Sequence, residues 1–147
     1  MQLAVRPAKA GDGPDVFRLL SQLWPEKSLS EDATQAAFQQ GLTLPTEVYI
    51  IASLDDWIVG FASISLENSL YHSGQLAWVE ALVTDKDVRG QGVGAALMDR
   101  VIEEAINRQC KAVEIMIDNQ ANAVKFVKAK GFLLRGNAFE LKLTIPR

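Results

Sequence analysis

The sequence predicts a single α/β domain of the α+β type, with a mixed central sheet of about six to seven strands and about four helices on its faces. Two observations predict this class. Short apolar segments alternate with amphipathic helical segments, and no repeat, low-complexity tract or linker divides the 147 residues. A chain of this length can build one core but is too short for two ordinary domains, so we expect residues 1–147 to form one domain.

The first half of the chain predicts a strand, two helices and then three strands. Asp12 or Asp15 can cap the first helix. Ser30 opens the second helix with acidic residues in its first turn, and Gly41 closes it. Gly60 indicates a bulge or the close approach of another element. The strands expected here are residues 3–6, 48–52, 57–66 and 76–83.

The second half predicts a helix, a strand, a helix and a closing hairpin. Apolar residues lie four apart along the first helix, at Val93, Leu97, Val101 and Ala105. Charged residues occupy its other side. Residues 112–117 form a strand. Residues 121–130 form a helix that stops at Gly131, with Phe132 placed for a Schellman ending. Strands 132–135 and 139–145 turn at Gly136-Asn137, which completes the order β-α-α-β-β-β-α-β-α-β-β.

Composition excludes several classes of function. A net charge of −3 argues against a general nucleic-acid partner, which would need a basic face. No apolar run approaches the roughly 20 residues of a membrane span, and the N-terminus lacks a signal-peptide pattern, so a cytoplasmic protein without a membrane partner is expected. With only Cys110 and His72, neither a disulfide framework nor a Cys/His zinc site is expected.

A glycine-rich segment, Arg89-Gly90-Gln91-Gly92-Val93-Gly94, directly precedes the long helix. Glycine lets the backbone bend so that successive N–H groups point one way, and it removes the side chains that would hold a diphosphate away. The helix adds its unpaired N–H groups and the positive end of its dipole. Lys86 and Arg89 can add charge. The segment predicts a diphosphate site, and a glycine-rich turn without a ligand is the competing interpretation.

Two other phosphate-binding motifs fit less well. Gly90 to Ala95 formally match the dinucleotide fingerprint G-x-G-x-x-A, but that motif directly follows a strand and has an acid about 20 residues on, at the end of the next strand. Here five charged or polar residues separate Val83 from Gly90, and Glu114 lies in the middle of its strand. The Walker pattern G-x-x-x-x-G-K-[ST] is absent.

The glycine segment resembles the Q/R-x-x-G-x-G/A motif of the GNAT superfamily of N-acetyltransferases. Glu80-Ala81-Leu82-Val83 is similar to that family's fourth strand. Ala123, Phe126 and Gly131-Phe132 are similar to its late N-x-x-A-x-x-F-Y-x-x-x-G-F pattern. The predicted element order is also the family's, so the resemblance covers nearly the whole chain. A weaker similarity, at Gln22-Leu23-Trp24-Pro25 and residues 57–83, links the N-terminal half to aminoglycoside 6′-N-acetyltransferases.

The resemblance implies transfer of an acetyl group from acetyl-CoA to a primary amine by direct attack in a ternary complex. Leu82 and Val83 would pair with the pantetheine arm, and the N–H of one of them, assigned to Leu82, would be the oxyanion donor, worth on the order of 3 kcal/mol of barrier. Asn119 and Phe126 would also contact the cofactor. The pyrophosphate would be held by the backbone N–H groups of Arg89, Gly90, Gln91, Gly92, Val93, Gly94 and Ala95.

Glu80 is the predicted general base, acting directly or through water, or a carboxylate that binds the substrate. It is the only ionisable residue in the apolar strand 76–83 and lies nine positions before Arg89, where several family members carry a catalytic acid. Partial burial would raise its pKa and make it a better base. A structural salt bridge is the alternative role.

One position departs from the family pattern. Val127 stands where the family usually has a tyrosine that serves as general acid, and valine cannot donate a proton. The alternative function is therefore a catalytically weak or inactive acyl-CoA-binding regulatory module.

The acceptor is expected to be a small molecule, such as a polyamine or an aminoglycoside-like amino sugar, or a peptide amine. Trp24 and Glu26, in the connection between the first two helices, are candidate acceptor-binding residues. Trp78 joins them because alternation places it on the same strand face as Glu80. Since the family is often dimeric, a homodimer is a further expectation.

Overall fold

The computed structural model describes residues 2–117 and 121–144, which fall into two compact units, Met1–Met116 and Ile117–Arg147. The first unit contains the sheet and the second contains one helix, α4 (Ala121–Ala129). The helices and strands of the first unit, in chain order, are β1 (Leu3–Pro7), α1 (Gly13–Leu23), α2 (Glu31–Gly41), β2 (Glu47–Leu54), β3 (Trp57–Ser69), β4 (Gly74–Thr84), α3 (Val93–Asn107) and β5 (Ala112–Ile115). That residues 1–147 form one domain stays a prediction.

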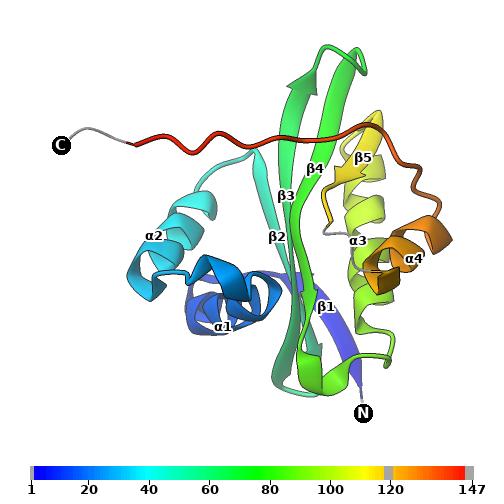
Figure 1. The fold of residues 1–147 in the computed structure, drawn as a ribbon. Coiled ribbons are helices and arrows are strands. Elements are labelled where there is room, and N and C mark those ends of the chain that lie inside the picture. Colours follow the sequence, from blue (N-terminus) through cyan, green and yellow to red (C-terminus); the bar gives the residue numbers. More distant parts are fainter. Residues whose placement is uncertain (1, 118–120, 145–147) are drawn as a thin grey trace. The chain divides into compact units, whose positions relative to one another are not determined.

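The sheet of the first unit has the order β1-β2-β3-β4-β5. All neighbours are antiparallel except β4 and β5, which are parallel. The helices α1 and α2 lie on one face of the sheet and α3 on the other (Figure 1). The predicted α+β class with a mixed sheet is therefore confirmed, with five strands instead of six or seven.

The predicted closing hairpin is wrong. Among the described residues, 132–144 contain no strand, although Gly136 has the positive φ of +82° that a turn favours. The prediction placed strands at residues 132–135 and 139–145, and residue 145 lies outside the described residues. A strand needs a neighbour that takes its backbone N–H and C=O groups, and no strand of the described residues pairs with this segment.

Helix ends follow the sequence signals closely. The Ser30 hydroxyl accepts a hydrogen bond from the Ala33 N–H at 3.2 Å, which confirms it as the cap of α2. The Schellman ending of α4 is also confirmed, because the Phe132 N–H donates to the Val127 carbonyl at 3.0 Å and Gly131 has a φ of +96°. Asp12 occupies the N-cap position of α1, but its carboxylate is taken by the Arg6 guanidinium at 2.8 and 2.9 Å.

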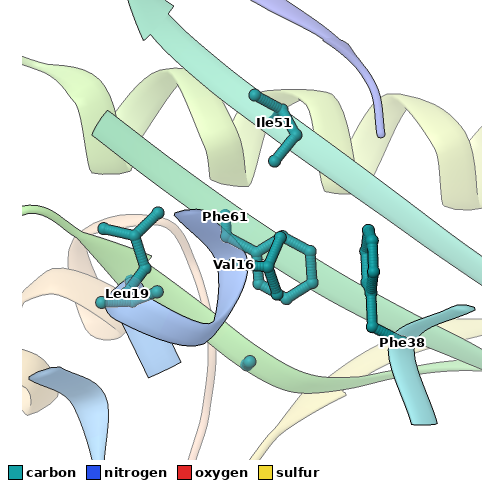
Figure 2. Close-up of a cluster of buried hydrophobic side chains, with 7 residues drawn as sticks. Val16, Leu19, Phe38, Ile51 and Phe61 are labelled. Atoms are coloured by element: carbon teal, nitrogen blue, oxygen red, sulfur yellow. The ribbon is translucent and has the colours of Figure 1, made fainter. Parts of the chain in front are cut away.

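The core between the sheet and the pair α1 and α2 is aromatic at its centre. Figure 2 shows side chains of α1 and α2 meeting those of the strands, with Phe38 and Phe61 among them. Phe38 stacks on Tyr49 with ring centroids 5.3 Å apart and meets Phe61 edge-on at 6.3 Å. Burial of each such side chain contributes roughly 1.5–3 kcal/mol, so this cluster holds α2 against the sheet.

On the opposite face, α3 approaches the sheet most closely at Gly60. A Cβ added there would lie 2.8 Å from Cδ1 of Leu97 and 3.0 Å from Cγ1 of Val93. Both side chains are fully buried in the apolar face of α3. The close approach predicted for Gly60 is confirmed, and it sets the depth at which the start of α3 lies.

Replacing Gly60 with alanine should therefore destabilise the fold by about 1–3 kcal/mol, because the added methyl overpacks the contact with α3. Gly11→Ala is the matched control, since a Cβ at Gly11 meets nothing within 4 Å, and its effect should stay within about 0.5 kcal/mol. Urea denaturation of both variants measures the difference. Equal stabilities would contradict the packing described for Gly60.

Candidate functional site

The glycine loop has the geometry that an anion requires. Gly90 and Gly92 have φ values of +83° and +86°, and a Cβ at either would meet nothing within 4 Å, so both face open space. The first turn of α3 begins directly after Gly92 with no side-chain cap and no acidic residue. Its N–H groups and the positive end of its dipole are left for a ligand. The residues from Arg89 to Ala95 thus leave room and unpaired N–H groups for an anion, as the predicted pyrophosphate site requires.

Helix α1 anchors the entry to this loop. Asp85 is 2% exposed, and its carboxylate accepts the Asp87 N–H at 2.9 Å and pairs with the Arg18 guanidinium. Burial raises the pKa of Asp85, but these hydrogen bonds outweigh burial and hold the pKa below its ordinary value. One turn later, the Gln22 side-chain oxygen accepts the Lys86 N–H at 2.9 Å. Sequence reasoning missed Arg18, Gln22 and Asp85, because nothing in their spacing links α1 to residues 64 or more positions later.

Strand β4 loses its parallel partner before the loop begins. The pairing with β5 runs from Leu76 opposite Ala112 to Val79 opposite Ile115 and stops there. Strand β4 continues to Thr84, still paired with β3 on its other side. Within the described residues, the β5 side of the segment that contains Leu82 and Val83 therefore has no strand partner. This is the free backbone edge that the pantetheine arm would need.

A β-bulge places Glu80. Ser63 lies opposite Ala81 and Ile64 lies opposite Val79, so Glu80 is the extra residue of β4. A bulge changes the direction of its side chain and interrupts simple alternation. Glu80 consequently lines a cavity together with Ala81, while Trp78 does not.

That cavity has a volume of about 370 Å³ and lies between α1, α2 and the sheet. We call it the acceptor cavity. It brings together Trp24 and Glu80, two of the predicted acceptor-binding residues; Glu26 and Trp78 are not in its wall. Its lining residues are Val16, Leu20, Trp24, Lys27, Ser28, Leu29, Ser30, Ala33, Thr34, Ala37, Phe38, Tyr49, Phe61, Ser63, Glu80 and Ala81.

The electrostatics of the acceptor cavity centre on Glu80. Its side chain is exposed to the cavity opening, but partial burial raises the pKa of its carboxyl, and the neighbouring Glu47 carboxylate raises it further. Burial, Glu47 and Glu80 likewise raise the pKa of Tyr49. No salt bridge in the described part of the chain includes Glu80. A carboxylate without a cationic partner, open to a cavity, can bind an ammonium group and accept its proton.

The remaining predicted cofactor contacts lie outside the first unit. Phe126 is part of α4, in the second unit. Val127, next to it, is buried with 9% exposed. Asn119 lies outside the described residues.

Three further features concern metal, membrane and dinucleotide sites. In the described ranges, no group of three or more His, Cys, Asp or Glu side chains could hold a metal ion. No helix there has the length and apolar character needed to cross a membrane. Glu114, the acid weighed for a dinucleotide site, lies 2.9 Å from Nε2 of His72.

Comparison with known proteins gives consistent matches. A family model described as the acetyltransferase (GNAT) family matches residues 14–132. An aminoglycoside N(6′)-acetyltransferase type 1 from Klebsiella aerogenes is 29% identical over 124 residues, which cover 80% of this chain and 82% of that protein. An aminoalkylphosphonate N-acetyltransferase from Salmonella typhimurium is 25% identical over 129 residues, covering 87% and 83%.

A solved structure shows the same fold. It is the aminoglycoside N-acetyltransferase AAC(6′)-Iy in complex with CoA, and it has a TM-score of 0.84 at 20% identity. The match covers 98% of this chain and 96% of that one.

The geometry of the loop predicts a specific effect of Gly92→Ala. The added methyl would strain a backbone with positive φ and would project into the space assigned to the pyrophosphate, so the affinity for coenzyme A should fall by about tenfold or more. Gly136→Ala is the control, because Gly136 has a similar φ of +82° and open surroundings but lies outside the loop. Isothermal titration calorimetry with coenzyme A measures both. Unchanged affinity in Gly92→Ala would contradict the assigned loop.

Proposed function

Because the chain belongs to the acetyltransferase (GNAT) family, we propose that it transfers the acetyl group of acetyl-CoA to a small-molecule primary amine held beside Glu80. Family membership confirms the enzyme class and the acyl donor predicted from the sequence, an acetyl-CoA-dependent N-acetyltransferase. One observation carries the finer proposal: Glu80 lies in the wall of the acceptor cavity and two residues before Leu82, where β4 has left β5.

The donor site consists mainly of backbone. The N–H groups from Arg89 to Ala95 would hold the pyrophosphate, and Leu82 and Val83 would pair with the pantetheine arm. Acetyl-CoA, when bound, supplies a thioester carbon that the amine attacks, so that a C–N bond forms, the C–S bond breaks and coenzyme A leaves as its thiolate. We assign the oxyanion of this step to the N–H of Leu82, which is a fixed donor beside the cavity.

The acceptor amine depends on Glu80. An amine arrives protonated at neutral pH, and the Glu80 carboxylate would bind it and then take its proton, directly or through water. The raised pKa strengthens this carboxylate as a base. Cys110, the single thiol, is not in the cavity wall, which favours direct attack over a covalent enzyme intermediate. Val127 has no proton to give to the thiolate, so water is the proposed proton source.

Glu80→Gln should lower kcat/KM for the amine by about 10²–10⁴-fold, because glutamine can neither accept the proton nor balance the ammonium charge. A base works only when deprotonated. With its pKa raised, the wild-type rate should be lost at a higher pH than an ordinary glutamate would give, and this acidic limb should disappear in the variant. Assays of thiol release from acidic to mildly basic pH measure both effects.

Glu67→Gln is the matched control, since Glu67 is an exposed carboxylate on β3 outside the cavity. It should retain wild-type rates. A Glu80→Gln enzyme with an unchanged pH profile would overturn the assigned role. Tight acetyl-CoA binding without turnover of any amine would instead favour the non-catalytic module that Val127 suggests.

A further inference from the structure

We propose that the acceptor is an amphipathic monoamine: one primary amine held between Glu80 and Ser63, attached to an aryl or branched alkyl body that packs on the aromatic wall of the acceptor cavity. The proposal rests on the proposed function and narrows the substrate class. It excludes the polyamines and amino sugars that the sequence alone suggested.

The wall of the acceptor cavity is mainly apolar and aromatic. Ten of the sixteen lining residues are apolar or aromatic. Phe38, Tyr49 and Phe61 form a continuous ring cluster, with Tyr49 and Phe61 centroids 5.8 Å apart. Figure 2 shows Phe38 and Phe61 close together on the α2 side of the sheet. Such a wall binds an apolar body by removing its surface from water, at about 25 cal/mol per Å².

The charged side chains of the wall also bear on the number of ammonium groups that an acceptor can carry. Among the described residues that line the cavity, Glu80 is the one acidic side chain and Lys27 the one basic side chain. A polyamine or aminoglycoside would bring several ammonium groups, and each one without a carboxylate partner would lose hydration without compensation. Glu47 adds negative charge near Glu80, but it is not in the wall, so it offers no direct contact to a second ammonium group inside the cavity. The cavity therefore matches one positive charge.

The Ser63 hydroxyl offers a second contact for the amine. Ser63 is 6% exposed and lines the cavity, and its Oγ makes no hydrogen bond with the described residues. A buried polar group left in this state costs about 1–3 kcal/mol, which a ligand can recover. Ser63 lies opposite Ala81, the residue that directly follows Glu80. The hydroxyl and the carboxylate thus belong to adjacent positions of β3 and β4, where one ammonium group can donate to both.

A panel of amines tests the substrate class. With saturating acetyl-CoA, kcat/KM for 2-phenylethylamine and isopentylamine should exceed that for spermidine and glucosamine by about tenfold or more, as the loss of one uncompensated charge implies. A higher kcat/KM for spermidine or glucosamine would overturn this inference and leave the proposed function standing. If no amine in the panel releases coenzyme A, the proposed function fails, and this inference fails with it.

Ser63→Ala separates a binding role from a structural one. Removing an unsatisfied hydroxyl should leave the melting temperature unchanged or raise it, while KM for the amine should rise by about ten- to a hundredfold, the value of one hydrogen bond to a charged group. KM for acetyl-CoA should not change. Lower thermal stability with an unchanged amine KM would show that Ser63 only supports the fold.

A charge introduced into the wall tests whether the number of carboxylates in the cavity decides the acceptor. Ala37→Asp adds a second carboxylate to the lining and should shift the ratio of kcat/KM values toward spermidine by about tenfold. Ala36→Asp is the control, because Ala36 is exposed on the same helix but is not in the wall. An equal shift in both variants would mean that general surface charge, and not the cavity, decides the acceptor.

Discussion

The parallel pairing of β4 with β5 stops at Val79, and the rest of the site depends on that stop. Immediately after Val79, the bulge at Glu80 directs the Glu80 carboxylate toward the acceptor cavity. The following residues, Leu82 and Val83, keep a free backbone edge, and the chain then enters the glycine loop. If β5 continued along β4, its own backbone would occupy the place assigned to the pantetheine arm. Donor and acceptor can thus meet at one strand because its neighbour ends early.

Helix α1 connects the two halves of the site. One of its faces contributes Val16 and Leu20 to the acceptor cavity, and Trp24 follows at its end. Another face contributes Arg18 and Gln22, which bind the turn that leads into the glycine loop. Because the side chains come from a single rigid element, the position of the cavity wall and the position of the loop entry are set together. The proposed acceptor cavity and the entry to the glycine loop therefore share one supporting helix.

Features that depend on residues close together in the chain were predicted from the sequence. Features that depend on how the strands pair were missed. The glycine loop, the Ser30 cap and the Schellman ending of α4 follow from residues close in the chain, and the structure has each of them. The bulge shifts the pairing of β4 by one residue, so alternation could not show that Trp78 stays out of the cavity wall or that Ser63 enters it. The closing hairpin failed for a related reason, since two apolar segments and a turn signal do not specify which strand a segment pairs with.

The division between backbone and side chain within the site has a consequence for how such enzymes diversify. The loop that would hold coenzyme A relies on main-chain N–H groups and two glycines, while the acceptor cavity is defined by side chains of α1, α2 and the strands. Under the proposed assignment, point substitutions in the cavity wall should change the acceptor without changing the binding of the donor. The two relatives are named for different amines, aminoglycosides and aminoalkylphosphonates, and they match this chain about equally well. This is expected if the thioester chemistry is kept within the family while the acceptor changes between its members.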